Sequence, residues 1–173
     1  MASKIEKTEV AYKGRVVTAK KLTVNSRLPI NVELAWAKVQ TPELLEFITK
    51  GKLKFKPLNS GFSFFCEEGK TLGTRMLAYG FIPFGGIHTL YFDKVDSDNH
   101  ILQTKEQDSI AKVWNHKISM TKIDKDHIEY EDEIVIYASG LTAIVTCWAK
   151  SFYEYRQRRW LKIVDNQRIN LTV

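Results

Sequence analysis

Three consecutive segments carry the clearest structural pattern of this chain: VWNHKISMTKI (residues 113–123), HIEYEDEIVIYA (127–138) and LTAIVTCWAKSFYEYRQRRWLKIVD (141–165). The first two segments alternate in character with a period of two, which is typical of strands that bury one face. The third is long, follows the breaker Ser139-Gly140, and repeats its apolar residues with helical spacing. Together they predict two antiparallel strands followed by one long amphipathic helix.

The predicted helix has one apolar face. At about 3.6 residues per turn, that face carries Leu141, Val145, Trp148, Ala149, Phe152, Trp160 and Ile163. The opposite face carries Lys150, Glu154, Gln157 and Arg158. A helix of this length can lie across a whole sheet, so we expect its apolar face to cover the strands.

The segments before residue 113 extend the same plan. Residues 20–28 alternate as a strand, Asn31 is a good N-cap for a helix over 32–39, and Thr41-Pro42 starts a second short helix that Gly51 closes. Strand patterns then follow at 52–58, 61–68, 74–82, 87–95 and 101–109, with turn signals and no helix between them. This order predicts an α+β fold: a curved antiparallel sheet wrapped around a long C-terminal helix, with two short helices after the first strand.

Length and composition fit one domain. We assign residues 20–165 to it, residues 1–19 to a mobile arm or an added edge strand, and residues 166–173 to a C-terminal tail. The net charge of +6 comes largely from basic residues near both ends of the chain, and no nucleic-acid-binding motif accompanies them. We therefore expect a solvated basic surface and no nucleic-acid partner, with weak contact to an anionic membrane as the alternative.

Targeting and cysteine patterns point to the cytoplasm. The start MASKIEKTEV has no apolar core of a secretory signal, and the longest apolar run, residues 140–149, is about half of a bilayer span. Cys66 and Cys147 form no CxxC pair and stand in apolar contexts, so we expect two buried free thiols rather than a disulfide.

Two titratable residues are placed on the buried faces of the strands. On the second strand Glu129, Glu131 and Glu133 must face water, which turns Asp132 inward; on the first, His116 shares the apolar face of Trp114. A buried carboxylate needs a partner. The candidates for Asp132 are His116, Arg75, Arg156 and Arg159.

Specific residues carry a resemblance to a known superfamily. Trp114-Asn115-His116, followed about twenty residues later by Asp132 to Tyr137 and then by Gly140 at the final helix, resembles bacterial START-like (SRPBCC, polyketide cyclase/dehydrase and lipid-transport) proteins. The aromatic-then-arginine end of the helix, from Phe152 to Arg159, and the strand with Thr104 and Glu106 are similar to that family as well. Residues 1–19 have no counterpart in the pattern, and Ser109 to Lys112 replace the Gly-Pro usual before the tryptophan.

The resemblance implies a helix-grip domain with a cavity for a lipid, polyketide or aromatic metabolite between the sheet and the final helix. Family members include binders, transporters and aromatase/cyclases, so three functions stay open here. The first is binding of a small hydrophobic molecule without catalysis, which we favour. The second is a polyketide cyclase/dehydrase-like enzyme that uses His116 with Asp132 or Glu106. The third is an interaction protein with a filled core, in which His116 and Asp132 form only a structural pair.

Candidate ligand-facing residues follow from these expectations. They are Arg75, Tyr79, His88, Trp114, His116, Met120, Tyr130, Trp148 and Phe152. His88 either stands at a cavity entrance beneath a mobile Gly85-Gly86 loop or is an ordinary strand-edge residue. The four histidines have no HxH or HxxxH spacing, so we expect no metal site. We also expect no cofactor, and a monomer or a homodimer.

Overall fold

The structure, a computed structural model, describes residues 1–58 and 66–170. Its strands are β1 (Ala2–Tyr12), β2 (Arg15–Leu28), β3 (Leu53–Pro57), β4 (Thr71–Ala78), β5 (Ile82–Asp96), β6 (Ile101–Gln107), β7 (Val113–Lys122) and β8 (Ile128–Tyr137). Its helices are α1 (Val32–Val39), α2 (Pro42–Thr49) and α3 (Thr142–Asn170), with a short 3-10 turn at Ser139–Leu141. The expected strand over 61–68 falls mostly outside the described residues, and 66–68 are not in a strand.

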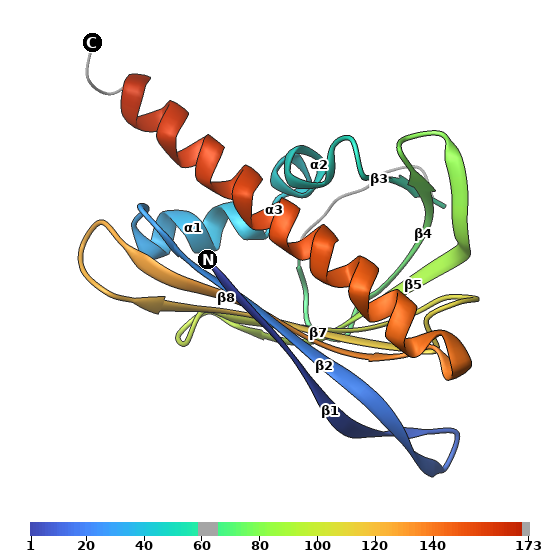
Figure 1. The fold of residues 1–173 in the computed structure, drawn as a ribbon. Helices are drawn as coiled ribbons and strands as arrows, with labels where there is room; N and C mark the ends of the chain where they lie inside the picture. Colours follow the sequence, from blue (N-terminus) through green and yellow to red (C-terminus); the bar gives the residue numbers. More distant parts are fainter. Residues whose placement is uncertain (59–65, 171–173) are drawn as a thin grey trace.

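All strands of the described residues form one antiparallel sheet in the order β1-β2-β8-β7-β6-β5-β4-β3. Figure 1 shows the sheet curving around α3, which crosses it on the same side as α1 and α2. The predicted helix-grip architecture, with a curved antiparallel sheet around a long C-terminal helix, is therefore confirmed.

The N-terminal residues form the outermost strand of this sheet. β1 pairs along its whole length with β2 through a tight turn at Lys13 and Gly14, whose φ values are 49° and 73°. Two consecutive positive φ values suit the twist of a two-residue hairpin. At the other end of the chain, α3 continues to Asn170, beyond the expected helix end at 165, and residues 171–173 lie outside the described part.

The two short helices begin where the sequence predicts. The side chain of Asn31 accepts hydrogen bonds from the backbone N–H groups of Glu33 and Leu34, and that of Thr41 accepts one from Leu44. These contacts satisfy backbone donors that a helix start leaves unpaired. The apolar faces of the two helices then close one end of the space between sheet and α3.

Two buried clusters hold α3 against the sheet. One surrounds Trp160, which packs on Tyr130 near α1 and α2. The other surrounds Phe152 and Tyr153 over the beginning of β7 and the end of β8. Fully burying a side chain of this size contributes about 1.5–3 kcal/mol. None of the described helices combines the length and the apolar character that crossing a bilayer requires.

Both cysteines of the chain are free thiols in the structure. Cys66 is partly buried, but the expectation that Cys147 is buried is wrong, because it lies on the face of α3 turned away from the sheet and is exposed. The Gly85-Gly86 pair, expected in a loop, lies inside β5.

Candidate functional site

The described residues enclose a cavity of about 120 Å³ between the inner face of the sheet, α2 and α3. One water molecule needs roughly 10–15 Å³ of such space, so the cavity has room for a small organic molecule. Its walls are mainly apolar and come from strands β3 to β7 and from the helices, including Ile48, Phe92, Ile118, Trp148 and Phe152. The interior is therefore not completely filled by side chains.

A band of polar side chains runs across the inner face of the sheet, and all of its members except Asp132 line the cavity. It consists of His88 on β5, Thr104 and Glu106 on β6, His116 on β7 and Asp132 on β8, and we call it the polar band. Each residue lies on the inner face of its strand, and the antiparallel register sets Thr104 beside His116. Neighbouring members lie close enough for hydrogen bonding or ion pairing over most of the band.

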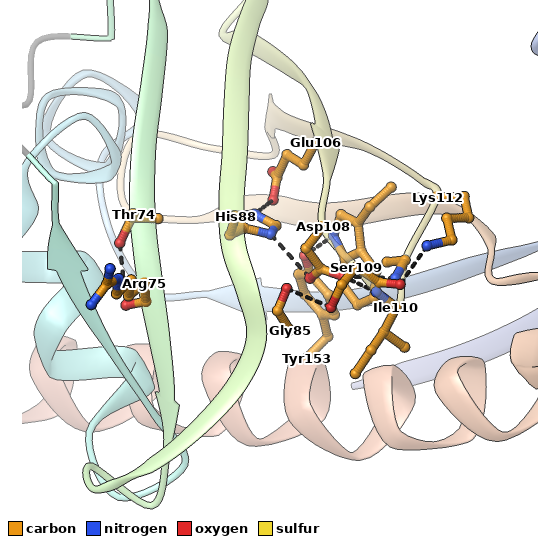
Figure 2. Close-up of polar contacts among 12 residues, drawn as sticks. Thr74, Arg75, Gly85, His88, Glu106, Asp108, Ser109, Ile110, Lys112 and Tyr153 are labelled. Atoms are coloured by element: carbon orange, nitrogen blue, oxygen red, sulfur yellow. Dashed lines mark hydrogen bonds and ion pairs between the residues drawn. The ribbon is translucent and has the colours of Figure 1, made fainter.

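His88 stands between two carboxylates at one end of the polar band. Its Nε2 lies 2.8 Å from Glu106 Oε2, and its Nδ1 lies 3.4 Å from Asp108 Oδ2. Thr104 Oγ1 donates to the other Glu106 oxygen at 2.5 Å, and the backbone N–H groups of Ile110 and Ala111 donate to Asp108 at 2.7 Å. Figure 2 shows both carboxylates directed at the imidazole ring.

The backbone at Gly85 makes room for this contact. A Cβ atom at Gly85 would lie 2.7 Å from Asp108 Oδ2, which is a steric clash. The φ angle of Gly85 is 68°, a value that glycine adopts without strain. The register of β4 against β5 shifts at this point, as in a β-bulge. Gly85 also accepts hydrogen bonds at its backbone oxygen from the N–H and the hydroxyl of Ser109, which fix the turn that carries Asp108.

The buried charges in this cluster support one another. Burial alone would lower the pKa of His88, but the hydrogen bonds to Asp108 and Glu106 and the charges of both carboxylates outweigh it and raise the pKa to about 9. Burial likewise opposes ionisation of Glu106 and Asp108, yet the hydrogen bonds to His88 hold both pKa values below their usual range. At neutral pH the cluster is therefore an imidazolium between two carboxylates.

Asp132 lies at the other end of the polar band and is 1% exposed. Its Oδ1 accepts from His116 Nε2 at 2.8 Å, and its Oδ2 accepts from Gln157 Nε2 at 3.0 Å. Burial would raise the pKa of Asp132, but the hydrogen bond from His116 and the positive charge of Arg156 lower it. The buried carboxylate is thus satisfied, with His116 as its direct partner and Arg156 as a neighbouring charge.

The other two arginines considered as partners of Asp132 act elsewhere. Arg75 is exposed, because the neighbouring Thr74 and Met76 take the inward positions of β4, and Figure 2 shows it away from the His88 cluster. Arg159 instead donates from Nε to the backbone oxygen of Phe47 at 2.7 Å, which ties α3 to α2.

Five of the nine expected ligand-facing residues line the cavity: His88, Trp114, His116, Trp148 and Phe152. The other four do not. Arg75 points outward, and Tyr79 is 60% exposed with a φ of 53° in the turn after β4. Met120 and Tyr130 are buried in the core cluster that also holds Trp160.

The three candidate catalytic residues also divide by position. Glu106 and His116 line the cavity, whereas Asp132 lies behind His116 and does not. Asp132 can therefore orient the imidazole of His116 but cannot touch a ligand directly.

Sequence reasoning missed three residues of the site. The role of Asp108 in the turn could have been predicted, because an Asp that follows a strand commonly accepts hydrogen bonds from the backbone of the next residues, as Asp108 does from Ile110 and Ala111. Tyr153 and Gln157 follow Ala149 and Phe152 at helical spacing, and both are buried, so the assignment of Gln157 to the polar face is wrong. The buried stripe of α3 is wider than its apolar residues show, because the sheet curves around the helix.

No family model matches the sequence, and neither does any curated protein sequence. Many solved structures are similar in fold. The Zhui aromatase/cyclase from Streptomyces sp. R1128 superposes with a TM-score of 0.64 at 10% identity, over 86% of this chain and 95% of that one. A START superfamily protein from Mycobacterium smegmatis gives a TM-score of 0.62 at 10% identity, over 85% and 98%.

A third similar structure is norcoclaurine synthase from Thalictrum flavum in complex with dopamine and hydroxybenzaldehyde. It gives a TM-score of 0.59 at 14% identity, over 86% of this chain and 87% of that one. At these identities the likeness concerns the fold, which is the one that the tryptophan–histidine strand and the final helix predicted. The chain therefore has the START-like helix-grip fold.

Proposed function

We propose that this chain binds a small, mainly apolar molecule in the cavity between its sheet and α3, with the polar band orienting the bound molecule. The cavity carries the proposal: about 120 Å³ of space, mainly apolar walls, and a few charged groups among the lining residues. Such a combination of apolar surface and few polar groups is typical of small-molecule sites. The similar structures support this class of function, since one contains dopamine and hydroxybenzaldehyde.

Native mass spectrometry of the purified protein, followed by extraction of anything bound, tests this proposal. A discrete apolar adduct at near one-to-one ratio is expected, together with saturable binding of an environment-sensitive apolar dye. Val145→Trp places a large ring in the cavity wall and should abolish both signals. Ile144→Trp is the matched control, because Ile144 is 70% exposed on the same helix and does not line the cavity. Equal binding by the two variants would refute a ligand site at this cavity.

A second candidate function is acid–base catalysis of the cyclase or dehydrase kind. It rests on one observation: Asp132 fixes Nε2 of His116 from behind, while His116 itself lines the cavity. A carboxylate that orients a histidine in this way is a common arrangement for a general base. A base of this kind would remove a proton from the carbon next to a ligand carbonyl.

Exchange of the methyl protons of 2-acetylnaphthalene in D₂O, followed by NMR, tests the catalytic candidate. Catalysed exchange by the wild type that His116→Gln abolishes, with binding retained, would support it. Asp132→Asn should reduce the exchange as well, because the ring of His116 would lose its orienting partner. No exchange above the rate of buffer alone would leave binding as the function.

A further inference from the structure

Arg156 is an arginine buried at the cavity, and its Nε has no acceptor among the described residues. Its side chain lines the cavity, the residue is 7% exposed, and its Nε has no hydrogen-bond partner among the described residues. The contacts of its guanidinium are with aromatic rings, 4.8 Å from the centre of Tyr153 and 5.8 Å from that of Phe152. An arginine has five N–H donors, and leaving even one of them unpaired in a buried site is costly.

The nearby charges show what kind of acceptor fits. Among the described residues, Glu106, Asp108 and Asp132 supply three negative charges around the cavity, and His88 and Arg156 supply two positive ones. The negative charges already outnumber the positive ones, so no positive charge remains uncompensated. A carboxylate or phosphate would add negative charge to this buried set, at high cost. A neutral oxygen would accept from Arg156 without disturbing the balance.

The rings beside Arg156 favour a planar ligand body. Phe152 stacks on Trp148 with centroids 5.1 Å apart and an interplanar angle of 10°, and both line the cavity. If a ligand packs a flat apolar ring against these two side chains, a substituent on that ring lies close to the guanidinium of Arg156, because the guanidinium itself contacts Phe152. Aromatic rings prefer such offset contacts with one another.

We propose that Arg156 is the specificity-determining residue of the cavity, and that it selects a planar apolar ligand carrying an uncharged carbonyl oxygen over the corresponding hydrocarbon or carboxylate. This inference rests on the proposed binding function and names its ligand class. Arg156 donates hydrogen bonds to the carbonyl oxygen, and the ring of the ligand packs against Phe152 and Trp148.

Three matched probes test the inference: 2-acetylnaphthalene, 2-ethylnaphthalene and 2-naphthoate, titrated against the full chain by quenching of tryptophan fluorescence. In the wild type the ketone should bind about tenfold or more tighter than the hydrocarbon, because a hydrogen bond to a charged donor in a buried site is strong. Arg156→Met should remove that preference, and Arg156→Lys should restore part of it. Arg158→Met is the control, since Arg158 is exposed on the same helix, and it should change nothing.

A second measurement does not depend on the variants folding. The infrared carbonyl stretch of 2-acetylnaphthalene bound to the wild type should shift to lower frequency relative to the ketone in an apolar solvent. An unshifted stretch, or a ketone preference that survives in Arg156→Met, would overturn the inference while hydrocarbon binding still supports the binding function. Tightest binding of 2-naphthoate, dependent on Arg156, would overturn it in favour of an anionic ligand. Failure of all three probes to bind would overturn the binding function and this inference together.

Discussion

Asp132 holds the polar band to α3, and its removal should cost the protein about 3–5 kcal/mol of unfolding free energy, as for other buried ion pairs that lose one partner. The side chain is 1% exposed and accepts from His116 at 2.8 Å and from Gln157 at 3.0 Å. Each hydrogen bond to a buried charge is worth about 1.5–3 kcal/mol, so two of them account for this loss. Asp132→Ala also removes the negative charge that stabilises the Arg156 guanidinium most.

Urea unfolding at neutral pH, followed by circular dichroism, measures this loss. Glu131→Ala is the matched control: it is an acidic residue on the same strand but on its solvent face, so it should change the free energy by about 0.5 kcal/mol or less. Asp132→Asn should cost less than Asp132→Ala, since the amide oxygen still accepts one hydrogen bond.

The pH dependence of the same experiment has a definite sign. Because folding lowers the pKa of Asp132, its contribution is present above an unfolded pKa of about 3.9 and is lost as pH falls through the lower folded value. The difference in unfolding free energy between the wild type and Asp132→Ala should therefore become smaller in strong acid. If Asp132→Ala cost no more than Glu131→Ala at neutral pH, the assignment of Asp132 as the anchor between sheet and helix would be wrong.

Three further predictions concern other parts of the fold. Folding raises the pKa of His88 to about 9, so the charged imidazole stabilises the folded protein fully below about pH 6.5, and this stabilisation is lost as pH rises through 9. In urea titrations over that range, the unfolding free energy of the wild type should fall by up to about 3 kcal/mol relative to that of His88→Gln. If the unfolding free energies of the two proteins changed in parallel with pH, this prediction would be wrong. Gly85→Ala should lower the melting temperature more than Gly80→Ala, because both glycines have a positive φ but only a Cβ at position 85 would clash with Asp108. Equal losses of melting temperature would argue against the close approach of Gly85 and Asp108. Removal of residues 1–13 should lower the melting temperature by several degrees and leave dye binding intact, because β1 pairs with β2 and supplies no lining residue among those described; lost binding would show that β1 shapes the site.

Much of the fold was accessible from the sequence because its local patterns are strong. The alternation along β7 and β8 correctly turned His116 and Asp132 inward, and the burial of both residues confirms it. Asn31 and Thr41 cap their helices as their positions predict, because capping depends only on a few neighbouring backbone groups.

The site itself was only partly predictable, because alternation states which face a residue occupies but not what lies above it. Trp114 and Met120 share one face of β7, yet the first lines the cavity while the second lies in the core cluster of Trp160. That difference depends on where α3 touches the sheet. Gln157 shows the same limit on the helix, since the width of a buried stripe depends on the curvature of the surface opposite.

Local sequence patterns predicted the order of the elements from residue 20 on apart from the expected strand over 61–68, the inward faces of β7 and β8, and the helix-grip plan. These features follow from periodicity and from side chains close in sequence. The contacts of His88 with Glu106 and Asp108, the place of Asp132 behind His116, and the lack of an acceptor for Arg156 Nε among the described residues became visible only in three dimensions. The physical reason is distance along the chain. These groups come from different strands and from α3, and their contacts depend on sheet register, on the bulge at Gly85 and on helix placement, none of which a local pattern encodes.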